Sequence, residues 1–428
     1  MWRRLVYAGA AAVLSAAALL LAGSLRGERS HAARAAAPFA PPSTPQAANV
    51  ERLQATLRTD PTDAKDWGQL GLAYEQRARE TGDPAYYTKA DGALHRALRL
   101  APRDPVATSG LGSLALSRHR FRDALRLGDQ ALRLAPSSAA PHAIIGDALV
   151  ELGRYSAAFR SFDTFAELKP GLAAYARISY GRELVGDQAG AIAAMRLAVA
   201  AGTAEPEPSA WTHWQLGKLY WATGRTKAAD EQYRAALAIF PGYVYALDAL
   251  AQVYAAKGDV DTAIDLEQRA ANQVPLPQFV AGLGDLYRID GKPKAAARQY
   301  GVIGVIDRLL VANGVRTDLE TALFRVDHGL QFRATLALAR RAQHERPSID
   351  GDDVLAWALA RNGHCTEALR YSRLALRLGT RDALKFFHRG MIERCLGDSA
   401  AARDWFGRAL ALNPHFSLLW APVARSLR

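Results

Sequence analysis

One short segment, "NGVRTDLETALFRVDHG" from Asn313 to Gly329, gathers side chains that could do chemistry. Three carboxylates and one imidazole stand within eleven positions of it: Asp318, Glu320, Asp327 and His328. Carboxylates and imidazoles can bind a metal ion or share acid–base catalysis. Asp318 and His328, however, are ten residues apart, which is ~15 Å along a helix and too far for shared coordination. The spacing therefore argues against a metal centre.

The same polar residues fit the two ends of a helix. Thr317 and Glu320 have the S/T-x-x-E spacing of a capping box, so we expect the helix to begin at Thr317. The apolar residues between the ends repeat with the spacing of one helical face: Leu319, Ala322, Leu323 and Val326. His328 and Gly329 follow where a cation and a glycine favour a helix C-terminus. We interpret the segment as a helix with marked ends.

No other segment carries a recognisable catalytic or cofactor motif. HExxH, GxSxG, P-loop and dinucleotide-binding glycine patterns do not occur in the sequence. The carboxylates of "RPSIDGDD" lack the spacing of a calcium-binding loop, and we expect them to cap a helix from a loop. The sequence therefore predicts a protein that is not an enzyme, with no cofactor, no metal and no small-molecule substrate.

Composition narrows the class of partner. The 428 residues include 54 Lys and Arg against 42 Asp and Glu, a net charge of +12. No run of five basic residues occurs, so the charge is dispersed and predicts no nucleic-acid partner. Two cysteines exclude a disulfide-rich scaffold.

The N-terminus has the features of a membrane segment. Arg3 and Arg4 precede Leu5–Gly23, which carries no charge and would form a helix of ~28 Å, close to bilayer thickness. We assign residues 1–24 to a signal anchor or signal peptide and residues 25–49 to an Ala/Pro-rich linker. The basic flank predicts a single-pass protein of the cell membrane whose remaining chain is extracytoplasmic. Secretion after signal cleavage is the alternative.

An internal repeat organises the rest of the chain. Pro102, Pro136 and Pro170 are 34 residues apart, and so are Pro241 and Pro275. A fixed period of this length is typical of stacked supersecondary units. Each period carries Leu-Gly-x-x-Tyr or a variant, as in "WGQLGLAY", then a second glycine and an Ala-x-x-x-aromatic element, as in "ATGRTKAADEQY". The first glycine permits close helix packing, and the second ends the first helix.

This pattern resembles the tetratricopeptide repeat (TPR) superfamily, whose unit is an antiparallel helix pair. The resemblance implies an all-α fold: a right-handed superhelical solenoid of about ten units with a concave groove. We assign a leading half-repeat helix to 50–61, the TPR array to 62–414 and a C-terminal capping helix to 415–428. The segment NGVxTDLExALFxxDHG and its C-terminal neighbours also resemble bacterial exported or membrane-anchored TPR proteins, which implies a location but no chemistry.

Two irregularities interrupt the array. Unit one has a seven-residue insertion around "RETGDPA" between its helices, and unit four has Ser179-Tyr180 where Leu-Gly is expected.

Cys365 should begin the second helix of unit nine, and Cys395 should end the first helix of unit ten. Contacting helices lie ~8–10 Å apart, whereas a disulfide needs Cα atoms within about 7 Å. A disulfide and two separately buried thiols both remain open.

The predicted partner site lies in the groove of units four to six. There the positions beside the buried helix face hold aromatic and singly charged residues: Tyr180, Glu183, Trp211, Trp214, Lys218, Trp221, Tyr245, Asp248 and Gln252. Exposed aromatic residues flanked by charge are typical of interface hot spots. We therefore predict a non-catalytic scaffold that binds a segment of a protein partner. Tryptophans that merely fill gaps beside unit four, and an enzyme or envelope-polymer binder with a dispersed groove site, are the alternatives.

Overall fold

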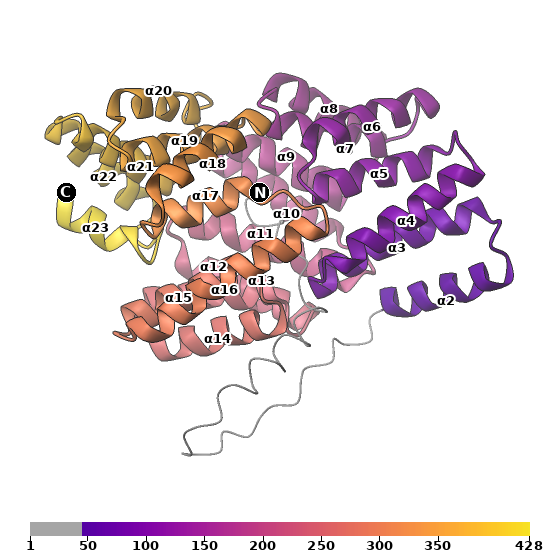
Figure 1. The fold of residues 1–428 in the computed structure, drawn as a ribbon, viewed down its shortest axis with the longest axis horizontal. Helices are drawn as coiled ribbons and strands as arrows, with labels where there is room; N and C mark the ends of the chain where they lie inside the picture. The colour runs from indigo at the N-terminus through magenta and orange to yellow at the C-terminus, as the bar shows by residue number, and fades with distance from the viewer. Residues whose placement is uncertain (1–44) are drawn as a thin grey trace, which may run out of the picture.

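The computed structural model describes residues 45–428, which form helices α2 to α23 joined by short turns and contain no strand (Figure 1). The predicted all-α solenoid is confirmed. The Leu5–Gly23 segment and most of the linker lie outside the described residues. Within residues 45–428, no helix is both long enough and apolar enough to cross a bilayer.

Ten successive helix pairs make up the array, between α2 (Pro45–Thr59) and α23 (Trp420–Leu427). From unit one to unit ten the pairs are α3 (Ala64–Thr81) and α4 (Ala85–Leu100), α5 (Pro105–Ser117) and α6 (Phe121–Leu134), α7 (Ala140–Glu151) and α8 (Tyr155–Leu168), α9 (Leu172–Leu184) and α10 (Gln188–Ala201), α11 (Pro206–Ala222) and α12 (Thr226–Ile239), α13 (Val244–Ala256) and α14 (Val260–Gln273), α15 (Pro277–Ile289) and α16 (Pro293–Ala312), α17 (Asp318–Asp327) and α18 (Phe332–Glu345), α19 (Ile349–Arg361) and α20 (Cys365–Ala375), α21 (Ala383–Cys395) and α22 (Ser399–Leu412).

Unit three shows why the repeated small residues are needed. A Cβ atom added at Gly146 of α7 would lie 2.4 Å from the Phe162 ring and 3.4 Å from the Ala158 carbonyl oxygen of α8. Only glycine therefore lets the two helices approach this closely. Gly153 follows α7 with φ of +71°, the left-handed conformation that glycine adopts most readily after a helix.

Unit four is a complete helix pair whose sequence register differs from the prediction by one residue. The Ser179 hydroxyl donates to the carbonyl oxygen of Ala191 at 2.7 Å, and Ala191 is the buried alanine of the second helix. Ser179 therefore occupies the glycine position of the unit, and Tyr180 is one place beyond it. Tyr180 is 4% exposed and packs in a cluster that also contains Ile349 of unit nine.

The insertion in unit one lengthens α3 rather than forming a loop between the helices. The added turn reaches other units. Gln76 Nε2 donates to Glu207 Oε2 at 3.0 Å at the start of α11, and Gly82 lies against Val274, where a Cβ atom would be 2.2 Å from Cγ1. Unit one therefore packs across the superhelix against units five and six.

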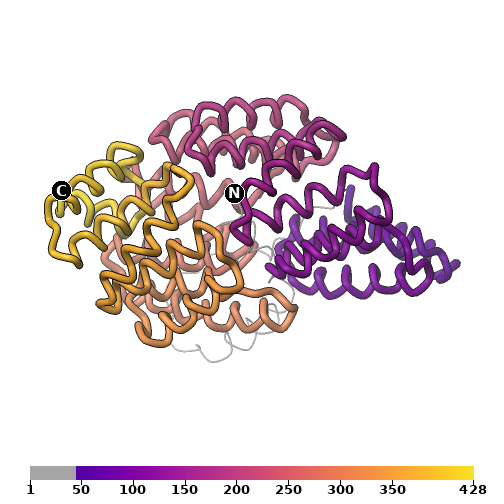
Figure 2. Tube along the Cα trace, turned by 90° about the horizontal axis from the view of Figure 1, so that it is seen from above, coloured from indigo at the N-terminus to yellow at the C-terminus, as the bar shows by residue number. Residues whose placement is uncertain are grey.

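The superhelix closes on itself, so that its later units pack on its earlier ones. Hydrogen bonds join residues that are 192 to 197 positions apart, close to six units of ~34 residues. Among them, the Ile349 amide donates to the Tyr155 hydroxyl at 2.7 Å, and Asn413 Nδ2 donates to the Trp221 carbonyl at 2.9 Å. Figure 1 shows α18 and α19 beside α7 and α8, and Figure 2 shows the curl of the trace from above.

A buried ionic cluster stabilises this contact between successive turns of the superhelix. The guanidinium of Arg346 donates to Glu151 at the end of α7 and, at 2.8 Å, to Glu320 Oε1 of α17. Arg346 is 4% exposed and Glu151 is 1% exposed. The two carboxylates raise the pKa of Arg346 even though its burial acts in the opposite direction. Units three and eight are thereby held together.

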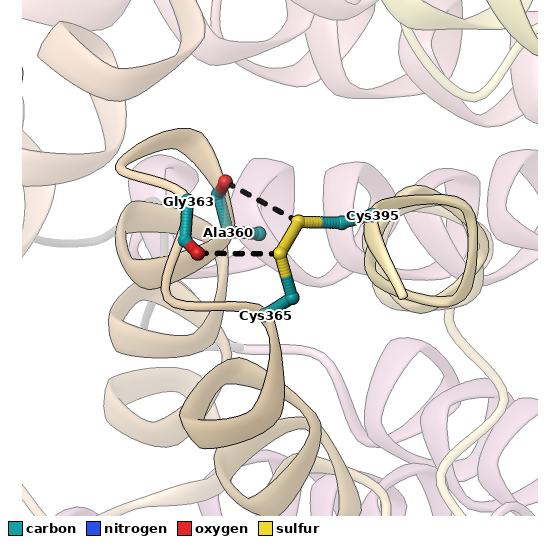
Figure 3. Close-up of a disulfide and its surroundings, with 4 residues drawn as sticks. All are labelled: Ala360, Gly363, Cys365 and Cys395. Atoms are coloured by element: carbon teal, nitrogen blue, oxygen red, sulfur yellow. Dashed lines mark hydrogen bonds between the residues drawn. A yellow bond between two sulfur atoms is a disulfide. The ribbon is translucent and has the colours of Figure 1, made fainter. Parts of the chain in front are cut away.

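The cysteines occupy the predicted helix ends and form a disulfide (Figure 3). Their Cα atoms are 5.7 Å apart, within the range that a disulfide requires. The carbonyl oxygens of Gly363 and Ala360 lie 3.4 and 3.9 Å from the two sulfur atoms. The bond links units nine and ten, so the alternative of two separate thiols is wrong.

Candidate binding site

A cavity of about 290 Å³ opens on the inner face of units six to eight. It is lined by the first helices α13, α15 and α17, with contributions from α14, α16 and α21, and is bordered by the turn that precedes α23. Its apolar walls include Leu286, Ile303, Leu323, Phe324 and Leu418. We refer to it below as the inner cavity.

Six of the 22 residues that line the inner cavity are acidic: Asp248, Glu267, Asp285, Asp307, Glu320 and Asp327. None is lysine or arginine, and His328 is the one basic residue among them. This composition is opposite to that of the whole chain, which carries a net charge of +12. The inner cavity is therefore an acidic site in a basic protein.

The carboxyl groups of Asp307 and Asp327 accept hydrogen bonds from neutral donors. Asp307 Oδ2 accepts from the Thr321 hydroxyl at 2.9 Å. Asp327 Oδ1 accepts from the indole nitrogens of Trp357 and Trp420 at 2.8 and 3.0 Å. Burial raises the pKa of Asp307 and of Asp327 because it removes water from the charged form. A nearby cation would favour the ionised form of both.

Asp285 and His328 form the one ion pair among the lining residues in which both partners face the cavity. His328 Nε2 lies 2.8 Å from Asp285 Oδ1, and Nδ1 lies 2.7 Å from the Phe324 carbonyl oxygen. Both ring nitrogens thus face acceptors, which the doubly protonated imidazolium satisfies. Burial lowers the pKa of His328, but the contacts with Asp285 outweigh it, so the pKa lies above 6.5.

No three His, Cys, Asp or Glu side chains converge closely enough to hold a metal ion anywhere in the described residues. The carboxyl groups of the inner cavity are instead spread around its walls on different helices. The arrangement is suited to a ligand that enters between them, with apolar contacts on the walls and charged contacts at several points.

The segment from Asn313 to Gly329 contributes more to this cavity than its helix-end pattern predicted. Of its acidic and histidine residues, Glu320, Asp327 and His328 line the inner cavity, and Asp318 is exposed. The expected capping box is wrong. Thr317 precedes α17, but its side chain makes no capping hydrogen bond. The carboxylate of Glu320, the other half of the expected box, is held by Arg346 instead.

The carboxylates of "RPSIDGDD" do not cap a helix from a loop either. Ser348 is the N-cap residue of α19, and its hydroxyl oxygen accepts from the Gly351 amide. Asp350 and Asp353 lie inside the first turns and contact Lys385 and His388 of α21, at 2.7 and 3.1 Å. These residues pair neighbouring units.

Among the nine predicted groove residues, Asp248 and Gln252 line the inner cavity. The prediction that the aromatic residues are exposed is wrong for three of them: Trp214, Tyr245 and Tyr180 are 0%, 3% and 4% exposed. Trp214 and Tyr245 pack against each other, with ring centroids 5.1 Å apart. The alternative that tryptophans fill gaps therefore describes Trp214 better than exposure does.

The other predicted residues are partly buried: Glu183, Trp211, Lys218 and Trp221. Lys218 Nζ lies 4.8 Å from the ring centroid of Trp214. The Trp221 ring lies 6.5 Å from that of His415, which follows unit ten in the chain. Asn413 of the same segment donates to the Trp221 carbonyl and so connects units five and ten. Closure of the superhelix thus covers Trp221. The sequence positions alone do not show which units meet.

A sequence signal for the missed cavity residues was present in unit seven. The positions that gave Asp248 and Gln252 in unit six, two before and two after the apolar residue of Leu-Gly, give Ala281 and Asp285 in unit seven. Both line the inner cavity. A preference for aromatic residues directed the prediction to units four to six, one or two units too early.

Residues 208–253, which cover α11, α12 and most of α13, match the family model described as tetratricopeptide repeat. This match agrees with the repeat of helix pairs along the array. Residues 208–253 therefore match a tetratricopeptide repeat, and the rest of the array repeats the same helix-pair architecture. No curated protein matches the sequence.

Several solved structures are similar to this chain. "Crystal structure of MamA" is 23% identical and covers 38% of this chain and 93% of its own, with a TM-score of 0.31. "Crystal structure of YrrB: a TPR protein with an unusual peptide-binding site" is 20% identical, with coverages of 43% and 93% and a TM-score of 0.29. "Human IFIT1 dimer with m7Gppp-AAAA" is 14% identical, with coverages of 86% and a TM-score of 0.48. Similarities of this size leave ligand and partner open.

Proposed function

We propose that this protein is a non-catalytic scaffold that binds a segment of a partner protein in the inner cavity. The observation that carries the proposal is the cavity itself, which has apolar walls and polar groups from at least three units. Its volume of about 290 Å³ is at the lower end for binding pockets, which run from ~300 Å³, and suits one or two side chains of an extended segment. TPR units generally act by binding proteins, in agreement with this proposal.

Recovery of a partner with the wild type and with two variants as baits tests the proposal. Ala281 lines the inner cavity, and Ala281→Trp would fill it. Ala297 is exposed on α16 and provides a matched control, Ala297→Trp. We expect crosslinking and purification from native membranes to recover a partner with the wild type and with Ala297→Trp, and to lose it with Ala281→Trp. Equal recovery with all three baits at equal folded amounts would place the partner elsewhere.

We also propose that the array works on the extracytoplasmic side of the cell membrane. Support comes from the uncharged Leu5–Gly23 segment behind Arg3 and Arg4. The test is protease treatment of intact and permeabilised cells. Digestion of the array in intact cells is expected, and protection until permeabilisation would contradict the location. A mature N-terminus beyond Ser24 would show that the signal is cleaved, and would favour secretion over a membrane anchor.

A further inference from the structure

The lining of the inner cavity indicates what kind of side chain would enter it. Its acidic residues come from five helices, and no lysine or arginine among the described residues lines it. Hydroxyl and indole groups donate hydrogen bonds to the carboxyl groups of Asp307 and Asp327, and these neutral donors leave the charge of an ionised carboxylate in place. Arg325 near Asp307 and Arg361 near Asp327 act on these charges from outside the cavity lining. Such a site attracts cations and repels anions.

Glu320 provides a second and separate indication. Its side chain is 8% exposed, and Oε1 accepts from Arg346, yet Oε2 has no hydrogen-bond donor within the described residues. Nδ1 of His119 lies 3.9 Å from Oε2, too far for a hydrogen bond, and already contacts the Arg316 carbonyl at 2.8 Å. Burial lowers the pKa of His119 to about 4, so this imidazole is neutral at pH 7. A buried carboxylate oxygen in the cavity wall thus lacks a donor, which is unfavourable unless a ligand supplies one.

The walls also fit the rest of a long basic side chain. Ile303, Leu323 and Phe324 offer apolar surface on which the methylene stem of lysine or arginine can pack while its charged end reaches the carboxylates. The amide of Gln278 lines the same space, and neither its nitrogen nor its oxygen has a hydrogen-bond partner in the described part of the chain. An amide can both donate to and accept from the main chain of a bound segment.

We propose that the inner cavity receives a lysine or arginine side chain of the partner segment, with the methylene stem against Ile303, Leu323 and Phe324 and the charged end at Asp307 and Glu320. This inference rests on the proposed function, because it identifies the residue type that the cavity selects. Charge complementarity favours a basic segment over an acidic or neutral one of the same shape.

Defined peptide probes test the proposal with the full-length protein. Four fluorescein-labelled libraries of eleven-residue peptides share randomised flanks and differ in one fixed central residue, which is lysine, arginine, norleucine or glutamate. Norleucine keeps the aliphatic stem without the charge. We expect the lysine and arginine libraries to bind about tenfold more tightly than the norleucine library, and the glutamate library to bind least, as measured by fluorescence anisotropy.

Three variants test whether the preference for lysine arises in the inner cavity. Asp307→Asn removes one charge and still offers an oxygen to the Thr321 hydroxyl, so the fold is kept, and we expect it to lower the preference for lysine about fivefold. Asp265→Asn makes the same change on a carboxylate that is 70% exposed outside the cavity, and should leave binding unchanged. Ala281→Trp should abolish binding of the basic libraries.

Each other outcome decides between the two proposals. Norleucine or glutamate libraries that bind as tightly as lysine, and are blocked by Ala281→Trp, would overturn the charge inference and leave the proposed function standing. A lysine preference that survives both Asp307→Asn and Ala281→Trp would reflect the protein surface and overturn the inference. Binding of no library, or of none that Ala281→Trp blocks, would remove the proposed function together with the inference.

Discussion

Replacing Arg346 by methionine tests whether the contact between successive turns holds the solenoid closed. Arg346 follows α18 in unit eight and joins Glu151 of unit three to Glu320 of α17. Methionine keeps much of the aliphatic volume beside the Phe121 ring, over which the guanidinium carbon lies at 5.3 Å. The substitution therefore removes the charge and its hydrogen bonds with little loss of packing.

The burial of the cluster sets the size of the effect. Arg346 is 4% exposed, Glu151 is 1% exposed and the Glu320 side chain is 8% exposed. Removing one partner of a buried pair leaves a charge without compensation and costs about 3–5 kcal/mol. Arg340 gives a matched control, because it donates to Glu367 at 2.8 and 2.9 Å but is 46% exposed. Arg340→Met should cost less than about 1 kcal/mol.

Urea unfolding followed by circular dichroism compares the two variants. Because repeat arrays can unfold in steps, the first transition is the relevant one. Hydrogen exchange of the Ile349 amide adds a local readout, since this amide donates to the buried Tyr155 hydroxyl across the same contact. We expect Arg346→Met to speed that exchange and Arg340→Met to leave it unchanged. Equal effects of the two substitutions on both readouts would refute the closed superhelix as a source of stability.

Further predictions follow from the buried groups. Trp214→Ala should destabilise the fold by about 3–5 kcal/mol in urea unfolding, because the side chain is fully buried; an unchanged midpoint would show it to be exposed. Cys395→Ser should cost about 3 kcal/mol through loss of the disulfide, and the unfolded, unreduced wild type should show no free thiol. Thr317→Val should cost less than about 0.5 kcal/mol, since the hydroxyl does not cap α17; a loss near 1 kcal/mol would restore the capping box. Burial lowers the pKa of His119 from 6.5 to about 4, despite the opposing charge of Glu320, so the unfolded state binds the proton first. Stability should therefore fall as the pH drops from about 6.5 to about 4, by roughly 2 kcal/mol at pH 5, and this loss should be absent from His119→Gln.

The features of the fold that depend on local contacts could be predicted from the sequence. Gly146 faces Ala158 and Phe162 within one helix pair, and such short-range packing repeats with the period of the chain. The helix ends at Cys365 and Cys395 follow from the same period. The disulfide does not, because its Cα distance of 5.7 Å depends on how two neighbouring units are tilted.

Closure of the superhelix could not be predicted in the same way. Contacts such as Tyr155 with Ile349 join residues 194 positions apart and depend on small rotations accumulated over almost six units. For that reason the burial of Tyr180 beneath unit nine was missed. Glu320 shows the same limit, since its spacing to Thr317 fits a capping box, whereas Arg346 holds its carboxylate beside the inner cavity.

Site-specific photocrosslinking tests binding in the inner cavity most directly. p-Benzoylphenylalanine placed at Leu323, which lines the cavity, is compared with the same group at Leu197, which is 55% exposed on α10. In native cell extracts we expect a partner to crosslink from position 323 and not from 197, and excess lysine-centred peptide to suppress the product. Equal crosslinking from both positions, or none from 323 while the partner still co-purifies, would contradict partner binding in the inner cavity.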